Sequence, residues 1–246
     1  MELCQSDEVG DRAPQSVSWL LDERASAGRE NLDASHVSRY DAKEDGDPLG
    51  DVRLLQGLGL DARSTVLDLG AGTGQFTLAV APSCSRVVAA DVSPVMQALL
   101  RQKVEAAGHK NIECVSAGFL TYEHSGAPVD FAYSRYALHH LPDFWKAQAL
   151  VRLGHFMRPG AVLRLCDVVY SFQLDEAGER IDSWCATGGT GIETDWTRAE
   201  LEEHVRDEHS TFTWLLEPMI ERSGFRIDDV DYSVDGIFAR YVVRRR

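Results

Sequence analysis

Apolar and polar positions alternate along the middle of the chain in short blocks, each typical of either a strand or a helix. Short, mostly apolar runs predict strands buried on both faces, at 65–69, 86–91, 111–116, 129–134 and 161–166. Between these runs, apolar residues recur at helical spacing, most clearly from Val95 to Val104, where Ser93 suits an N-cap and Gly108 a helix end. Strands that alternate with helices favour a parallel sheet covered on both faces.

The N-terminal part has a weaker pattern. Residues 1–13 are polar and aperiodic, so we expect them to be disordered. Residues 14–39 favour a helix, 42–50 a loop, and 51–57 a short helix ahead of the first strand.

The regular alternation stops after the fifth predicted strand. Residues 171–211 form an insertion, in which Thr197 and Glu200 predict a capping box at the start of a short helix. A further helix is expected over 212–222, interrupted by Pro218.

The C-terminal end has strand character again. Two extended runs, 225–232 and 237–243, are joined through Asp235-Gly236 and predict an antiparallel hairpin. A mostly parallel sheet would therefore carry an antiparallel edge.

The stretch Val66-Leu-Asp-Leu-Gly-Ala-Gly-Thr-Gly74 joins the first strand to a helix that begins at Gln75. Its glycines are spaced G-x-G-x-G, whereas a dinucleotide fingerprint has G-x-G-x-x-G. Asp68 stands inside the strand, where a carboxylate is awkward for a pyrophosphate but suits a ligand with a cationic part.

This stretch resembles the first motif of class I S-adenosylmethionine (SAM)-dependent methyltransferases. The resemblance covers about residues 50–243 and implies an α/β fold, a Rossmann-like doubly wound sheet that is mostly parallel and closed by the C-terminal hairpin. It also implies that 1–48 form an N-terminal helical lid and that 49–246 form the SAM-binding domain, with 171–211 as a substrate cap.

The resemblance implies a set of SAM contacts in the order of the predicted strand ends. Asp68 and the turn residues Gly70, Ala71, Gly72, Thr73 and Gly74 would face the methionine part, and Asp91 the ribose hydroxyls. The family often has an acid after its third strand for the adenine amino group, but here Gly118 stands at that position. We place Gly118 and Phe119 at the adenine. Val92, Ser134 and Tyr40 complete the predicted cofactor site.

Candidate catalytic residues follow the fourth and fifth strands. The segment Ala137-Leu-His-His-Leu-Pro-Asp143 is similar to one in small-molecule members related to quinone-biosynthetic methyltransferases. His139 and His140 titrate near neutrality and are candidate bases, as is Asp167. For each histidine, packing against the following helix is an equally good interpretation. The chain lacks the Asn/Asp-Pro-Pro-aromatic tetrapeptide of enzymes that methylate base or amide nitrogen.

Composition narrows the possible partners. The formal net charge of −14 repels phosphate backbones and argues against nucleic acid. No apolar run is long enough for a bilayer, and five scattered cysteines favour reduced thiols. We therefore expect a cytoplasmic protein with a small-molecule substrate, no membrane partner, and a monomeric or homodimeric state.

The favoured interpretation is a metal-independent SAM-dependent methyltransferase that moves a methyl group to an O, N or C nucleophile of a small organic molecule. One alternative is an NAD-dependent oxidoreductase, which the glycine spacing and Asp68 disfavour. The other is a regulatory protein that binds SAM without catalysis.

Overall fold

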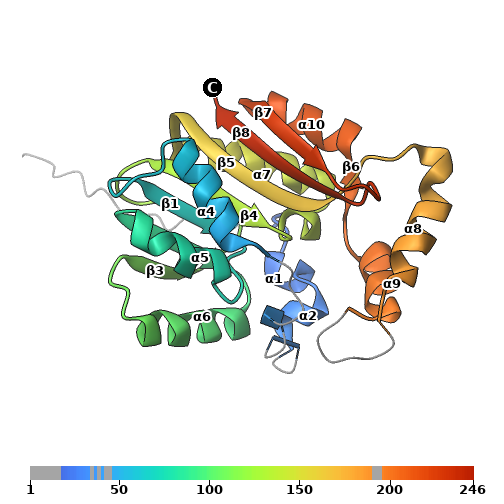
Figure 1. The fold of residues 1–246 in the computed structure, drawn as a ribbon, viewed down its shortest axis with the longest axis horizontal. Coiled ribbons are helices and arrows are strands. Elements are labelled where there is room, and N and C mark those ends of the chain that lie inside the picture. Colours follow the sequence, from blue (N-terminus) through green and yellow to red (C-terminus); the bar gives the residue numbers. More distant parts are fainter. Residues whose placement is uncertain (1–17, 34–35, 38–39, 42–45, 190–195) are drawn as a thin grey trace, which may run out of the picture.

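The structure is a computed structural model, and it describes residues 18–33, 36–37, 40–41, 46–189 and 196–246. In these residues a single mixed sheet has the strand order β3-β2-β1-β4-β5-β8-β7, and the short β6 pairs with β5 (Figure 1). The strands are β1 (Thr65–Leu69), β2 (Arg86–Asp91), β3 (Ile112–Ser116), β4 (Val129–Arg135), β5 (Met157–Tyr170), β6 (Thr211–Phe212), β7 (Phe225–Tyr232) and β8 (Phe238–Arg245).

The parallel part of the sheet is the predicted one. β1 pairs in parallel with both β2 and β4, β2 with β3, and β4 with β5. The chain then returns through β7 and β8, which pair antiparallel with each other, and β8 pairs antiparallel with β5. The α/β, Rossmann-like architecture and its closing hairpin are confirmed.

Helices cover both faces of this sheet (Figure 1). The longer ones are α4 (Pro48–Gly57), α5 (Gln75–Val80), α6 (Pro94–Ala107), α7 (Asp143–Phe156), α8 (Ala177–Ala186), α9 (Arg198–Asp207) and α10 (Thr213–Arg222). On one face, α4 and α5 bury Leu55, Phe76 and Val80 against β1 and β2. On the other, α7 and α10 bury Leu150 and Ile220.

The insertion forms a separate lobe beyond the ends of β5 and β8, built mainly from α8 and α9 (Figure 1). Trp184 and Leu201 join Tyr170 and Ile237 in a small apolar cluster that attaches the lobe to the sheet. The predicted capping box is present, because the Thr197 hydroxyl accepts from the Glu200 N–H and the Glu200 carboxylate accepts from the Thr197 N–H. We call residues 171–211 the cap.

Four local predictions are wrong. The helix before β1 begins at Pro48 rather than at residue 51, because Asp47 caps it, so 48–50 do not belong to a loop. The described part of 14–39 is not one helix but contains two short ones, α1 (Glu23–Ser26) and α2 (Arg29–Leu32), because Asp22 caps α1 and Ala27 is extended. Pro218 does not interrupt α10; it is exposed, so water can satisfy the carbonyl left without an N–H partner. β5 is longer than expected because β8 and β6 supply partners up to Tyr170.

Among the described residues, none of the helices combines the length and the apolar character needed to cross a lipid bilayer. Of the five cysteines, Cys4 lies outside the described residues, and the other four are free thiols.

A buried ion pair joins α4 to the sheet. The guanidinium Nε of Arg164 on β5 donates to Asp51 Oδ1 at 2.9 Å, and the Tyr133 hydroxyl donates to the other carboxylate oxygen at the same distance. The Arg164 and Asp51 side chains are only 9% and 14% exposed.

Removing the cation from this pair should be costly, since a carboxylate then stays shielded from water with one weak partner. We expect Arg164→Ala to lower the free energy of unfolding by ~3 kcal/mol in urea denaturation. The exposed Arg63→Ala variant should change it by less than ~0.5 kcal/mol. Equal losses in the two variants would show that the buried pair has no special role.

Candidate active site

The turn between β1 and α5 lies where the strand order reverses, with β2 on one side of β1 and β4 on the other. Ligands of open α/β sheets bind in the crevice beyond the carboxyl ends of the strands at such a point. The N–H groups of Gly70 and Ala71 both donate to the Ala90 carbonyl, which fixes the turn against the end of β2.

The three glycines of the turn all have positive φ, but they differ in what surrounds them. A Cβ at Gly70 would overlap Ala137, and one at Gly74 would overlap Leu100. A Cβ at Gly72 would meet only the Met96 sulfur, at 4.0 Å. Gly72 therefore borders open space, and its bare backbone can be approached closely by a ligand.

Two buried carboxylates flank the turn. Asp68 is 2% exposed and accepts from the Thr77 hydroxyl at 2.5 Å. Burial, helped by the charge of Asp91, raises the pKa of Asp68 to about 7. Asp91 accepts from the N–H groups of Gly72 and Ser93, at 2.8 and 2.7 Å, and burial raises its pKa as well.

Two adjoining pockets open beside the turn. The first extends from Asp68 over the turn towards Tyr133 and Pro48. The second extends past Asp91 and the end of β3 to the segment after β4, and is closed on its other side by residues of α1 and α2. Both pockets are lined by Tyr40, Gly70, Gly72 and Arg135.

Most of the predicted cofactor residues line these pockets. In the first are Tyr40, Asp68, Gly70, Ala71, Gly72 and Thr73, and in the second are Tyr40, Gly70, Gly72, Asp91, Val92, Gly118 and Phe119. Two do not: Gly74 is the N-cap of α5 and packs near Leu100, and Ser134 lies inside the sheet, 1% exposed. Arg135, next to Ser134, lines both pockets and was not predicted.

The comparisons with known proteins agree with this geometry. A family model described as a methyltransferase domain matches residues 66–160, which contain the turn, Asp91 and the two histidines. An uncharacterized methyltransferase of Anoxybacillus flavithermus is 27% identical over 164 residues, 67% of this chain and 70% of the relative. Another, from a Geobacillus strain, is 30% identical over 125 residues, 48% of this chain and 57% of the relative.

Residues 66–160 therefore form a methyltransferase domain.

Solved structures share the fold. A SAM-dependent methyltransferase from Aquifex aeolicus superposes with a TM-score of 0.58 at 20% identity, covering 87% of this chain and 99% of that one. A cyclopropane synthase from Mycobacterium tuberculosis gives a TM-score of 0.62 at 15% identity, covering 92% and 95%. The family implies SAM as the cofactor, whereas the resemblance to the quinone-biosynthetic branch stays a prediction.

The N-terminal segment closes the second pocket of the methyltransferase domain. Glu23 on α1 is 6% exposed, and its carboxylate accepts from the Leu120 N–H and the Thr121 hydroxyl at 3.0 and 3.1 Å. A Cβ at Gly118 would overlap this carboxylate. The Glu23 carboxylate therefore lies beside Gly118, the position after β3 at which the family often has an acid. Burial raises the pKa of Glu23.

The same segment contacts two further parts of the domain. The Ser93 hydroxyl donates to the Asn31 carbonyl, and the Thr73 hydroxyl donates to Asp41, which also pairs with Lys103. These contacts hold residues 31 and 41 against the turn and α6.

The structure separates the three predicted catalytic residues. His140 lines the second pocket, and burial followed by the charge of His139 lowers its pKa to about 3. Its ring nitrogens face the N-terminal segment, with the Gly28 N–H 3.5 Å from Nδ1 and Asn31 Nδ2 3.2 Å from Nε2. His139 and Asp167 line neither pocket.

His139 instead belongs to a buried cluster behind His140. Its Nδ1 lies 2.5 Å from Asp167 Oδ1, and its Nε2 lies 2.8 Å from Glu208 Oε2. His204 Nδ1 reaches the same Glu208 oxygen at 2.8 Å. Burial would lower the pKa of His139, but Asp167 and Glu208 outweigh it and raise the pKa to about 10. His204 and Glu208 were missed; their spacing of four residues on a predicted helix is the one sequence signal that points to them.

The large aromatic side chains in and beside the cap are mostly internal. Trp184 and Tyr170 are buried in the cap cluster, and Trp196 packs against it, whereas Trp214 is 56% exposed. Tyr136, which packs against the cap cluster, lines the second pocket and has a strained φ of 49°.

The raised pKa of Asp68 predicts how the free energy of unfolding depends on pH. Because the native state holds a proton up to about pH 7 and the unfolded chain loses it near pH 3.8, this group stabilises the fold at low pH. Its contribution should fall by up to ~1.4 kcal/mol per pH unit as pH rises from about 5 to about 7. Asp68→Asn should reduce the slope measured in urea denaturation by this amount, and the exposed Asp175→Asn should not. A slope in Asp68→Asn equal to that of wild type would assign it to other groups.

Proposed function

We propose that this chain binds SAM across the two pockets and transfers its methyl group to an oxygen, nitrogen or carbon of a small organic molecule. The observation that carries the proposal is the pocket lining: most of the predicted cofactor residues, at or just after the ends of β1, β2 and β3, border two pockets that share Gly70 and Gly72. Residues 1–48 would act as the lid and 171–211 as the substrate cap.

The residues present suit the chemistry of SAM. In the first pocket, Asp68 offers a buried negative charge to the cationic methionine part, and Gly72 leaves room for close approach. In the second pocket, Asp91 can still accept hydrogen bonds from ribose hydroxyls. A carboxylate offers about four lone pairs, and the two N–H groups use only part of them. When bound, SAM supplies a methyl group on a sulfonium centre.

We assign the adenine amino group to Glu23. Its carboxylate borders the second pocket beside Gly118 and Phe119, and an amino group is a donor that a carboxylate accepts strongly. Glu23 would thus supply from the lid the acid that the chain lacks after β3.

The acceptor would enter between the lid and the cap. A cavity of about 680 Å³ there is lined by Ala27, Glu208 and His209, among others, and its volume is typical of sites for small organic molecules. Ala27 also lines the second pocket, so the two spaces meet at α1. This supports a small acceptor.

Within the site, alignment would supply most of the rate acceleration. His140 is the predicted catalytic residue on the pocket wall, where its neutral ring can orient an acceptor once the Gly28 and Asn31 contacts are released. The transfer itself needs no metal, because the leaving group is a neutral thioether on which no charge develops.

The glycine turn provides the first test. In Gly72→Val, a β-branched residue must adopt a φ of 52°, and its side chain would project into the space assigned to SAM. We expect wild type to gain several degrees in melting temperature with S-adenosylhomocysteine and none with NADH, by preferential binding to the folded state. Gly72→Val should melt cooperatively with no shift.

Gly57→Ala is the matched control, because a Cβ there meets nothing within 4 Å and lies in α4 away from the turn. It should keep the full shift. A wild-type shift with NADH would favour the oxidoreductase alternative, and binding without release of S-adenosylhomocysteine in a broad acceptor screen would favour the regulatory one.

The role of Glu23 is tested by ligand preference. Wild type should bind S-adenosylhomocysteine about ten- to a hundredfold more tightly than S-inosylhomocysteine, which has an oxo group in place of the amino group. Glu23→Gln keeps an acceptor for the Leu120 N–H but adds a donor, so it should reduce this preference to a few-fold. The exposed Glu105→Gln should leave it unchanged. If calorimetry gives the same preference for Glu23→Gln as for wild type, Glu23 does not contact the base.

A further inference from the structure

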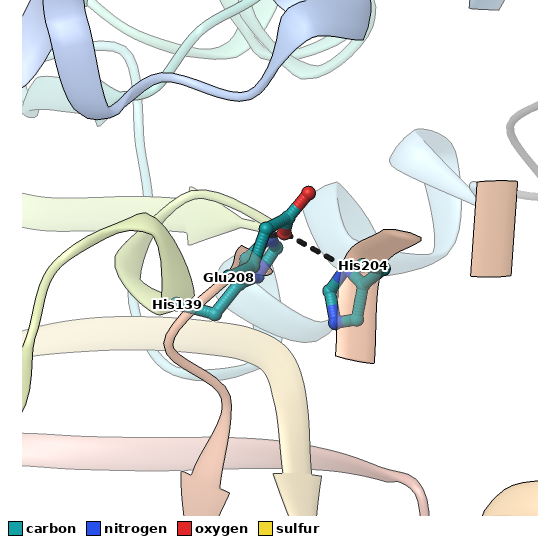
Figure 2. Close-up of side chains that lie close together, drawn as sticks. All are labelled: His139, His204 and Glu208. Atoms are coloured by element: carbon teal, nitrogen blue, oxygen red, sulfur yellow. Dashed lines mark ion pairs between the residues drawn. The ribbon is translucent and has the colours of Figure 1, made fainter. Parts of the chain in front are cut away.

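The cluster behind His140 brings together side chains from two distant segments. His139 belongs to the short helix η2 (Leu138–His140), His204 to α9, and Glu208 to the C-cap of α9. Figure 2 shows the Glu208 carboxylate between the two imidazole rings. Three atoms, His139 Nε2, His204 Nδ1 and Glu208 Oε2, lie within 4.8 Å of one another.

The outer nitrogens of both rings are already held. His139 Nδ1 faces Asp167 Oδ1 at 2.5 Å, and His204 Nε2 faces the Ser210 hydroxyl at 2.9 Å. A neutral imidazole has one donor and one acceptor nitrogen. When the outer nitrogens donate to these oxygens, both inner nitrogens turn lone pairs towards a carboxylate.

Such an arrangement needs a cation at its centre. The His139 side chain is 6% exposed, and the Glu208 and His204 side chains are 13% and 14% exposed. Little water can therefore screen the ring lone pairs from the Glu208 carboxylate. A proton on one of the rings is the alternative occupant, but Glu208 Oε2 is shielded from solvent and has no hydrogen-bond partner in the described part of the chain.

We propose that His139, His204 and Glu208 bind a divalent transition-metal ion of the Zn²⁺ class, which links the cap to the core of the methyltransferase domain. Two histidines and one glutamate are an established zinc ligand set, and a carboxylate on the outer nitrogen of a ligating histidine is the usual supporting contact. Bonds of about 2.0–2.2 Å would spread the three atoms to about 3.4 Å, a shift of roughly half an ångström that side-chain rotation supplies.

This metal is not part of the methyl transfer, so the inference goes beyond the proposed function. Its consequence is positional: it would hold α9 against η2, immediately beside His140 on the pocket wall. The backbone already makes one contact of this kind, because the His209 N–H donates to the His139 carbonyl.

The test uses the full-length protein, stripped with a chelator and then titrated with Zn²⁺ in competition with a chromophoric chelator. We expect about one Zn²⁺ per chain by elemental analysis, a rise in melting temperature on loading, and, with Co²⁺, the visible absorption of a low-coordinate site with nitrogen ligands. His204→Ala and the isosteric Glu208→Gln should each weaken Zn²⁺ binding at least a hundredfold. Asp167→Asn should weaken it about ten- to a hundredfold, as supporting residues do.

His155→Ala is the matched control, because His155 is an exposed histidine in the last turn of α7. It should bind Zn²⁺ like wild type. If wild type retains no Zn²⁺, or if Glu208→Gln and His204→Ala retain as much as His155→Ala, the proposal is wrong and the cluster holds only a proton. The melting shift with S-adenosylhomocysteine, measured on the same samples, reports separately on the cofactor site.

Discussion

The contact between Asp91 and the glycine turn is the constraint on which the site depends. One carboxylate accepts from Gly72 in the turn and from Ser93 at the start of α6, and thereby joins the ends of β1 and β2. The turn can take this position only because its glycines adopt positive φ, and because any side chain at two of them would overlap Ala137 or Leu100. Both pockets are bounded by the backbone that this contact holds.

The regions that the sequence predicted well are those where local pattern and tertiary environment agree. β1 and β2 were predicted to the residue, since each is an apolar run bounded by a glycine turn or by Ser93-Pro94. α6 ends at Gly108 in the left-handed conformation, as its sequence indicates. In these elements burial and backbone preference favour the same state, so a single sequence contains the information.

The regions that were predicted poorly from the sequence depend on partners far away in the chain. Glu23 contacts Leu120, which is 97 residues away, and no local sequence pattern can indicate such a contact. His139 was interpreted as a base from its residue type, whereas its environment is decided by Asp167 and by Glu208 of the cap. The N-terminal segment failed as a helix because short-range capping at Asp22 and an extended Ala27 prevailed over a weak apolar pattern.

The N-terminal segment also determines how the second pocket can open. Between residues 23 and 31 it is attached to three different parts of the domain: Glu23 to the segment after β3, Asn31 to Ser93, and the Gly28 N–H to His140. Because these residues lie within ten positions of one another, full opening of this side of the pocket would require all three contacts to break. The combined strength of the three contacts would then set how long the pocket stays closed.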